Sequence, residues 1–277
     1  MNIRKPSVAG LFYPKDPFDL KKELEDLFAL NKADGSFDYR HIAGIIAPHA
    51  GYVYSGAQAA KAYSYLKGRQ YKLVCIISPS HRLYFNATSI SSHDAYRTPL
   101  GDMPIDSIAR DITLSCKGIE RSIRGHDKEH ALEVQLPFVQ HLFGNIPILP
   151  MVMGDQSLLS IENLAKCIST LYAQYGRDIL FIASSDLSHF HDAKTAKTMD
   201  GKFIELLQKA KSDELYNLLY SEDVEACGGG AILALLKGLK INKNEIKVLA
   251  YTHSGEVSND NSSVVGYSSA ILMKDEG

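Results

Sequence analysis

The sequence predicts a three-layer α/β/α sandwich with a largely parallel but mixed central sheet. Short apolar runs alternate with segments of helical periodicity along most of the chain. The central runs, such as 73–77, are apolar throughout, as expected for strands that are covered on both faces. No repeat, low-complexity tract or linker rich in Pro and Ser divides the chain, so we expect residues 1–277 to form a single domain.

The first predicted element is a helix that begins near Pro17. Asp16 can cap this helix, Pro17 suits its first position, and Leu20 and Leu24 belong to one apolar face. Strand-like runs and helical patterns follow in alternation. We expect strands at 42–47, 73–78, 146–151, 179–183, 246–250 and 264–273, and helices at 56–67, 105–115, 130–142, 158–175, 195–211 and 228–239.

Two segments depart from this regular alternation. Residues 88–99 are more polar and alternate in character, which predicts an antiparallel hairpin and hence a mixed sheet. Within the helix expected at 130–142, Pro137 should end or kink the helix, because proline cannot donate the backbone hydrogen bond.

Composition and charge argue against several classes of protein. Hydrophobic residues make up 45% and charged residues 22% of the chain, which is typical of a globular protein. The formal net charge is −2 and no basic stripe is present, so nucleic-acid binding is not expected. Apolar runs such as 42–48 are too short to span a bilayer, and residues 1–10 lack the apolar run of a signal peptide. We therefore expect a cytoplasmic protein that does not bind membranes.

The four cysteines do not predict a disulfide framework, because the chain is long and contains no CxxC pair. Cys75 and Cys167 lie in apolar patterns and are expected in the core. The sequence around Cys116 does not indicate a role for it. Cys227 differs from the others because three glycines follow it directly.

Three strand-like runs each deliver a histidine into the loop that follows the strand. His49 comes after the run 42–47, His81 after 73–78, and His189 after 179–183. Open α/β sheets bind ligands at the carboxyl ends of their strands. Imidazole is also the commonest metal ligand in proteins, so the pattern predicts a ligand or metal site at this edge of the sheet.

Cys227 has two interpretations that the residues alone leave open. The thiol would lie at the start of the predicted helix 228–239, where free amides and the helix dipole favour a thiolate that could bind a metal. Under this interpretation its pKa should be lowered. Alternatively, the glycines allow tight packing between helix and strand, and Cys227 is an inert buried thiol.

Other motifs carry a weaker signal. His130 and Glu133 share a helix face, but their spacing alone indicates an ordinary solvated helix start. Ser184 and Ser185 lie close to Asp186 and His189 in sequence, yet catalytic triads require proximity in space. The chain has no dinucleotide-binding loop, phosphate-binding loop or nucleophile elbow.

The same segments resemble the Memo family over almost the whole chain, with many motifs in the same order. The motifs are Arg4-Lys5-Pro6-Ser7-Val8-Ala9-Gly10-Leu11-Phe12-Tyr13-Pro14, Ala47-Pro48-His49-Ala50-Gly51-Tyr52, Ser78-Pro79-Ser80-His81, Thr98-Pro99-Leu100-Gly101, Glu129-His130 with Gln135-Leu136-Pro137, Ser184-Ser185-Asp186-Leu187-Ser188-His189, Ala226-Cys227-Gly228, and Ser254-Gly255-Glu256 with Val264-Val265-Gly266-Tyr267.

The resemblance implies a fold similar to that of the class III extradiol dioxygenases, in which two histidines and a carboxylate hold Fe(II). It implies that His49 and His81 are the metal histidines, and that His130 and His189 match the histidines that handle protons beside the metal. Cys227 stands where the dioxygenases place their carboxylate. A thiolate is a softer ligand and shifts the preference toward copper(I), zinc or thiolate-tolerant iron.

Memo-like proteins are associated with metal-dependent redox chemistry and, in animals, with binding of phosphotyrosine-containing peptides. In microbes their genes often accompany that of a radical-SAM protein. The resemblance therefore implies a small-molecule or peptide ligand and a radical-SAM protein as a partner.

Our leading hypothesis is a metal-dependent oxidoreductase. His49, His81 and Cys227 would hold one iron or copper ion, with zinc as an alternative. His130 or His189 would act as general acid or base, and Asp186 would orient a neighbouring imidazole. The rival hypothesis is a binding module that uses the same cleft for a phosphopeptide or a small anion. Its candidate contacts are Arg82, Arg97, Arg124, Tyr52 and Tyr54.

Overall fold

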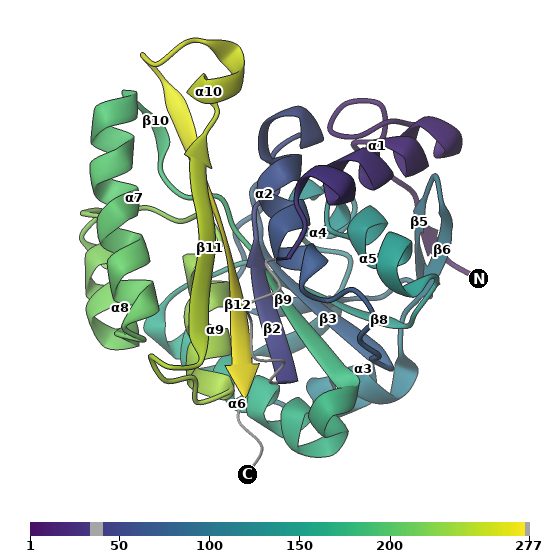
Figure 1. The fold of residues 1–277 in the computed structure, drawn as a ribbon. Coiled ribbons are helices and arrows are strands. Elements are labelled where there is room, and N and C mark those ends of the chain that lie inside the picture. Colours follow the sequence, from purple (N-terminus) through teal and green to yellow (C-terminus); the bar gives the residue numbers. More distant parts are fainter. Residues whose placement is uncertain (34–40, 275–277) are drawn as a thin grey trace.

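A nine-stranded mixed sheet forms the centre of the structure, a computed structural model that describes residues 1–33 and 41–274 (Figure 1). Its four middle strands are parallel, and antiparallel pairs lie toward both sides. The order across the sheet is β10 (His189–His191), β12 (Val264–Lys274), β2 (His41–Ala47), β9 (Ile179–Ser184), β3 (Leu73–Pro79), β8 (Ile148–Met153), β4 (Thr88–Ser91) and β7 (Ile119–Ser122), with β11 (Ile246–His253) also paired to β12.

Helices cover both faces of this sheet, as the sequence predicts. One face packs against α1 (Pro17–Leu30), α2 (Tyr52–Ser64), α4 (His130–Glu133) and α5 (Leu136–Phe143). The other packs against α3 (Ser107–Leu114), α6 (Leu158–Tyr175), α7 (Ala193–Gln208), α8 (Ser212–Tyr220) and α9 (Gly229–Gly238). The remaining elements are the short helices η1 (Gly176–Asp178) and α10 (Gly255–Ser258) and a small sheet of β1 (Ile3–Arg4), β5 (Ala95–Thr98) and β6 (Gly101–Pro104).

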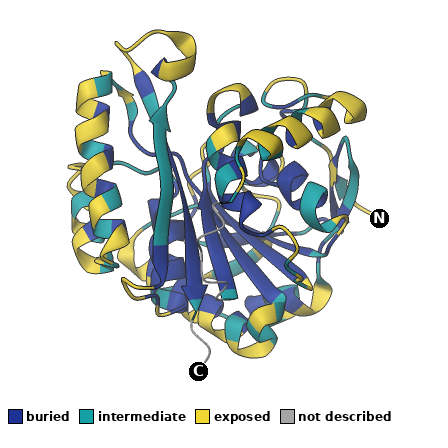
Figure 2. Ribbon diagram, in the orientation of Figure 1, coloured by how far each residue is buried: buried dark blue, intermediate teal, exposed yellow. Residues whose placement is uncertain are grey.

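The alternation of side chains along the strands divides the core into two layers. In β3, Cys75 and Ile77 belong to the layer under α6 and α9, whereas Val74 and Ile76 belong to the layer under α2 and α5. All four side chains are fully buried, and Figure 2 shows the central strands dark blue along their length. Burying each large aliphatic side chain stabilises the fold by about 1.5–3 kcal/mol.

Most of the predicted elements are confirmed. Asp16 caps α1, accepting hydrogen bonds from the amides of Phe18 and Asp19, and Pro17 is the first helical residue. Each of the expected strands lies within two residues of an observed strand boundary at its start. Cys75 and Cys167 are buried in the core. Within the described parts of the chain, no helix has both the length and the apolar character needed to cross a membrane.

The hairpin predicted at 88–99 is wrong. Its two halves are strands β4 and β5, which belong to different sheets. Strand β4 pairs with β7 and β8 of the large sheet, whereas the true hairpin joins β5 to β6 in the small sheet. The local pattern indicates strands correctly, but the pairing partner depends on contacts that the pattern does not contain.

The helices predicted at 130–142 and 195–211 are both present, and the first is interrupted near Pro137 as expected. It consists of two helices, α4 and α5, and the break lies just before Pro137, which is in the first turn of α5. The start of α4 is not solvated as the spacing suggested, because Glu129 and Glu133 are 2% and 0% exposed. The helix predicted at 195–211 is α7, which ends three residues earlier, and α8 begins beyond the predicted end.

Candidate metal centre

Parallel strands bring three loops to one edge of the sheet. Ala47 of β2 pairs with Ser184 of β9, and Ile77 of β3 pairs with Ala183 of β9. The loops that follow these strands therefore begin side by side, and they carry His49, His81 and Asp186.

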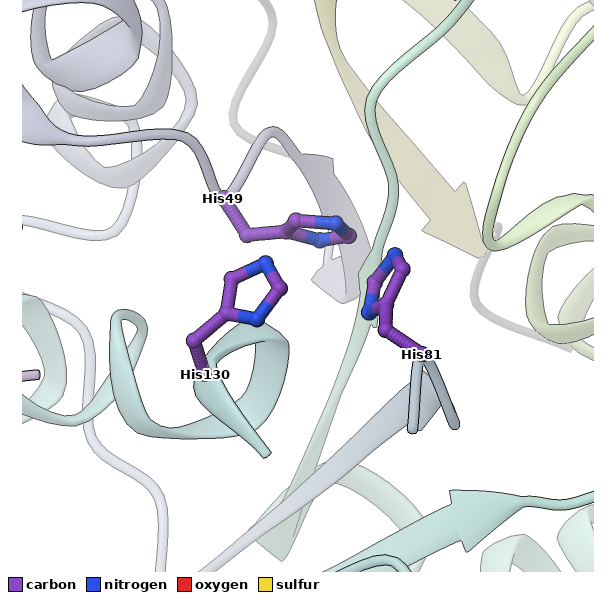
Figure 3. Close-up of side chains that lie close together, drawn as sticks. All are labelled: His49, His81 and His130. Carbon is purple, nitrogen blue, oxygen red and sulfur yellow. The ribbon is translucent and has the colours of Figure 1, made fainter. Parts of the chain in front are cut away.

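Three imidazoles converge at this edge (Figure 3). The ring centroid of His49 lies 5.2 Å from that of His81 and 5.5 Å from that of His130, the first residue of α4. The centroids of His81 and His130 are 4.7 Å apart. One nitrogen of each ring lies within 4.8 Å of the others, so the cluster could hold a metal ion.

The tautomer of His49 follows from the hydrogen bonds of Ser184. The Ser184 hydroxyl donates its single proton to the carbonyl of Ala131 and accepts a hydrogen bond from the amide of Gln135. It can therefore only accept from Nδ1 of His49, which lies 2.9 Å away. Nδ1 thus carries the proton and Nε2 presents a lone pair to the site. In this tautomer Nδ1 of His49 faces Ser184 with a proton, so His49 cannot take the proton of the Ser184 hydroxyl.

Glu129 has the same effect on His81, and it was missed by sequence reasoning. One carboxylate oxygen accepts from Nδ1 of His81 at 2.9 Å, and the other accepts from the His81 amide at 2.7 Å. Burial alone would raise the pKa of Glu129, but the bond from His81, its charge and two backbone amides outweigh burial and lower the pKa. An ionised Glu129 can only accept, so Nδ1 of His81 carries a proton and Nε2 is the ring nitrogen left for a metal. A carboxylate that orients a ligating histidine is a recurrent feature of metal sites.

His130 lies between this carboxylate and an aromatic ring. Its Nδ1 is 3.3 Å from the Glu129 carboxylate, and its ring packs 5.0 Å from that of Phe12. Burial lowers the pKa of His130 to about 4. Burial, with the neighbouring histidines, also lowers the pKa of His49 well below its usual value. Both rings are therefore neutral at pH 7, the form that binds metals.

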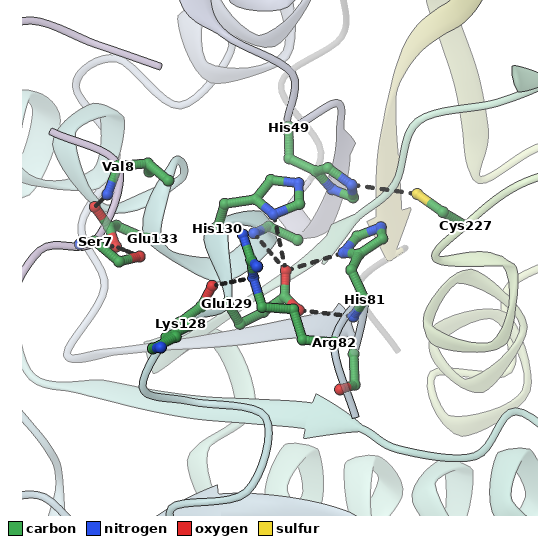
Figure 4. A network of polar contacts seen from close by, with 12 residues as sticks. Ser7, Val8, His49, His81, Arg82, Lys128, Glu129, His130, Glu133 and Cys227 are labelled. Carbon is green, nitrogen blue, oxygen red and sulfur yellow. Dashed lines mark hydrogen bonds and ion pairs between the residues drawn. The ribbon is translucent and has the colours of Figure 1, made fainter. Parts of the chain in front are cut away.

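Cys227 joins the cluster through His49 (Figure 4). Its Sγ lies 3.2 Å from Nε2 of His49 and also accepts a hydrogen bond from the amide of Asp186 at 3.2 Å. The lowered pKa expected for this thiol is wrong for the protein by itself: burial, followed by the charge of Asp186, raises the pKa of Cys227. The sulfur lies just before α9, but the loss of water outweighs the helix terminus.

The glycines after Cys227 serve close packing. A Cβ on Gly228 would lie 2.2 Å from the carbonyl oxygen of Ser184, and a Cβ on Gly230 would lie 2.7 Å from Gln156. This part of the packing interpretation is therefore correct. The thiol itself faces an imidazole rather than a purely apolar core.

Asp186 and His189 border the same region. Asp186 accepts a hydrogen bond from the backbone amide of His49 at 2.7 Å, and its other oxygen lies 4.0 Å from Nε2 of that ring. Ser184, rather than Asp186, thus makes the orienting hydrogen bond to the imidazole. Burial raises the pKa of Asp186 to about 7. His189 and Cys227 line one cavity of about 570 Å³ between α6, α8 and α9.

Of the arginines and tyrosines that the rival hypothesis assigns to an anion site, the structure brings only some together. Arg82 and Arg124 line a pocket of about 370 Å³ beside Glu129. Arg97 instead forms an exposed ion pair with Asp102 on the small sheet. Tyr52 is buried and donates to the carbonyl of Val134, and Tyr54 is partly exposed on α2.

Comparison with known proteins decides the family. The model of the Memo-like proteins matches residues 4–271 of the chain. The chain belongs to the Memo family. A MEMO1 family protein of Thermotoga neapolitana is 37% identical, over 98% of this chain and 99% of the relative. Another, from Methanosarcina barkeri, is 38% identical over 98% of this chain and 100% of its own length.

The Memo chain also has a structural neighbour with little sequence similarity. An uncharacterized protein from Escherichia coli K12 superimposes with a TM-score of 0.51 and 14% identity, over 83% of this chain and 99% of the neighbour. This likeness concerns the fold alone.

Proposed function

We propose that this Memo protein binds one metal ion through His49, His81 and Cys227 and carries out oxidoreductase-type chemistry on a small molecule. The observation that carries the proposal is the contact between Sγ of Cys227 and Nε2 of His49, at 3.2 Å. A thiol so close to an imidazole lone pair, with a second prepared imidazole beside it, is a typical ligand arrangement for a transition metal. Iron or copper would supply the redox chemistry, and zinc is the alternative ion.

The surrounding side chains support this assignment. Ser184 and Glu129 each accept a hydrogen bond from Nδ1 of one histidine, so Nε2 is the nitrogen of each ring that is left for the metal. His130 is close enough to serve as a further ligand or as a base. With its pKa lowered to about 4 by burial, His130 is unprotonated at neutral pH, so it can act as a ligand or as a weak base but holds no proton to donate as an imidazolium.

The cavity beside Cys227 is the proposed substrate site. Its volume of about 570 Å³ suits a small organic molecule, and His189 on its wall can exchange protons with a bound ligand. Three carboxylates line it, from Asp155, Glu222 and Glu225, and its lining among the described residues contains neither Lys nor Arg. A neutral or cationic substrate therefore fits better than an anionic one.

Metal retention by single variants tests the ligand set. Cys227→Ser should lower the bound metal from about one ion per chain to a small fraction of it, because serine is a poor ligand for soft metals. Cys116→Ser is the matched control, since the half-buried thiol of Cys116 contacts the carbonyl of Ile112 and the thiol of Cys167 rather than the histidine cluster. The measurement is metal content after purification and dialysis, with oxygen consumption on catechols and thiols as the activity assay. If His130→Gln loses the metal and Cys227→Ser keeps it, three imidazoles hold the ion and the sulfur does not.

A second candidate function is binding of an anionic ligand without catalysis. The observation in its favour is the pocket of about 370 Å³ lined by Arg82, Arg124 and Lys128, with Leu83 and Ile123 as its apolar part. Asp127 and Glu129 also line it, which leaves a small excess of basic side chains. Such a pocket suits an anion on an apolar body. Full metal retention by Cys227→Ser, together with phosphate binding that is lost in Arg124→Ala, would make this function the better one.

A further inference from the structure

We propose that the amino-terminal segment, residues 4–13, is a brace that positions Glu129 and His130 at the metal centre, with Arg4 and Glu133 as positioning residues. This inference rests on the proposed metal site, but it concerns side chains that touch no ligand.

The first step is the carboxylate of Glu133, which lies in the same short helix as His130. It is fully buried and accepts from the amide and hydroxyl of Ser7 at 2.8 and 2.9 Å, from the amide of Val8 at 3.0 Å and from the hydroxyl of Tyr13 at 2.6 Å. Arg4 forms an ion pair with the same group. These donors all come from the amino-terminal segment, so Glu133 fastens α4 to that segment. Figure 4 shows Ser7 and Val8 beside Glu133.

The second step is the guanidinium of Arg4, which is 2% exposed. Its Nε donates to the carbonyl of His126 at 3.0 Å, and Nη2 donates to the carbonyl of Glu129 at 2.8 Å. Together with the ion pair to Glu133, these bonds hold the turn before α4 and the end of α4 at once. The rigid, planar fork of arginine can make such contacts together, whereas lysine presents a single ammonium group.

The third step joins the other end of the segment to the site. The ring of Phe12 packs against the ring of His130, and the carbonyl of Phe12 accepts a hydrogen bond from the amide of Tyr52 at 2.8 Å. A Cβ on Gly51 would lie 3.6 Å from the backbone of Phe12. The segment thus lies against both the loop after His49 and the turn that carries His130.

These contacts determine where the Glu129 carboxylate points. Glu129 is held from behind through its own carbonyl by Arg4, and its side chain faces His81 and His130. A buried ion pair is weak evidence for stability, because the loss of hydration offsets much of the attraction. The ion pair between Arg4 and Glu133 lies one helical turn from His130, and this position favours a role in orienting His130 and Glu129.

The test compares Tyr13→Phe and Arg4→Lys with Tyr71→Phe in the full-length protein. Tyr13→Phe removes one donor to Glu133 with little change in volume. Tyr71→Phe is the matched control, because its hydroxyl donates to the carbonyl of Ile42 at 2.8 Å, in a strand rather than at the site. Zinc and cobalt(II) affinities are measured by competition with a chelator, and thermal unfolding gives the stability of each variant.

We expect Arg4→Lys to weaken metal binding about tenfold, as the loss of an orienting partner does in other metal sites. Tyr13→Phe should weaken metal binding by a smaller factor. Tyr71→Phe should leave metal binding unchanged, even if its melting temperature falls as much as that of Tyr13→Phe. Equal metal affinities for the wild type and all three variants would overturn the proposal that this segment is a brace.

A second readout works without any metal. The imidazole ¹⁵N shifts of His81 and His130 report the tautomer that Glu129 imposes, so they should change in Arg4→Lys and Tyr13→Phe and remain constant in Tyr71→Phe. This result would support the brace even if the wild type bound no metal, in which case the proposed function alone would fail. If Arg4→Lys does not fold, unchanged shifts and affinity in Tyr13→Phe still overturn the proposal.

Discussion

At the scale of single residues, the hydrogen bonds of the imidazoles describe the candidate metal site better than the distances between their rings do. The imidazoles of His49 and His81 come close together, but their usefulness as ligands depends on which nitrogen carries the proton. Ser184 and Glu129 decide this, since each can only accept from the Nδ1 that faces it. Nε2 of each ring is therefore the nitrogen left for a ligand.

Ser184→Ala should test this reasoning. The substitution removes the hydrogen-bond partner of Nδ1 of His49 and the donor to the Ala131 carbonyl, whereas the Gln135 amide keeps its bond to the Pro48 carbonyl. The loss should destabilise the fold by about 1–3 kcal/mol. It should also weaken metal binding about tenfold, because the tautomer of His49 is no longer fixed.

The matched control is Ser78→Ala, since Ser78 is equally buried but its hydroxyl has no hydrogen-bond partner among the described residues. Urea unfolding and metal affinity are measured on both variants. Similar losses in the two variants would mean that the hydroxyl of Ser184 does not orient the ring.

At the scale of elements, the start of α9 is packed against the end of β9 without room for a side chain. A Cβ on Gly228 would lie 2.2 Å from the Ser184 carbonyl and 2.8 Å from the Cβ of Ser185. The amide of Gly228 also donates to the Ser185 hydroxyl at 2.9 Å. This contact fixes the distance between Cys227, just before α9, and His49, whose ring is held by Ser184.

Gly228→Ala should therefore separate the two elements. We expect a loss of about 2–4 kcal/mol in the free energy of unfolding, because the clash is with backbone atoms that cannot rotate away. Metal affinity should fall with it, as Cys227 moves away from His49.

Gly201→Ala provides the opposite control. Gly201 is exposed in the middle of α7 and an added Cβ meets nothing within 4 Å, so alanine should stabilise the helix by about 0.5–1 kcal/mol. Chemical denaturation of both variants gives the comparison, and a Gly228→Ala protein as stable as the wild type would contradict the packing argument.

At the scale of the whole molecule, buried histidines make the stability depend on pH. His126 is 1% exposed and contacts Tyr96 and Ser89 through its ring nitrogens. Burial, which outweighs the bond from Ser89, lowers the pKa of His126 to about 3. The unfolded chain, with a pKa near its usual value of about 6.5, binds more protons than the folded protein across this interval.

The contribution of His126 to the free energy of unfolding should consequently be constant above about pH 6.5. It should fall as the pH drops from 6.5 toward 3. One such group contributes a slope of at most about 1.4 kcal/mol per pH unit. Urea unfolding at a series of pH values measures the slope, and NMR follows the ring of His126. Protonation of His126 near pH 6.5 in the folded protein would contradict the prediction.

Much of the architecture was predictable because it rests on local patterns. Uninterrupted apolar runs indicate strands covered on both faces, and Asp16 with Pro17 indicates the start of α1; both predictions are confirmed. The position of His49 and His81 just after parallel strands was also sufficient to predict that they lie at one edge of the sheet. The hairpin at 88–99 failed because strand pairing is not a local property.

By itself, the sequence determined most of the strands, the edge of the sheet and two of the histidines in the cluster, His49 and His81, because periodicity and strand-end position are properties of neighbouring residues. The strand-end pattern does not single out His130, which lies at the start of a helix. The tertiary structure alone decided which nitrogen of each histidine faces the site and which groups hold the ring. Ser184 lies 135 positions from His49, and Glu133 lies 129 positions from Arg4, so no sequence pattern connects them. The donors and acceptors that set a tautomer or hold a turn are matched only when the chain has folded, since burial away from water is what requires each of them to find a partner.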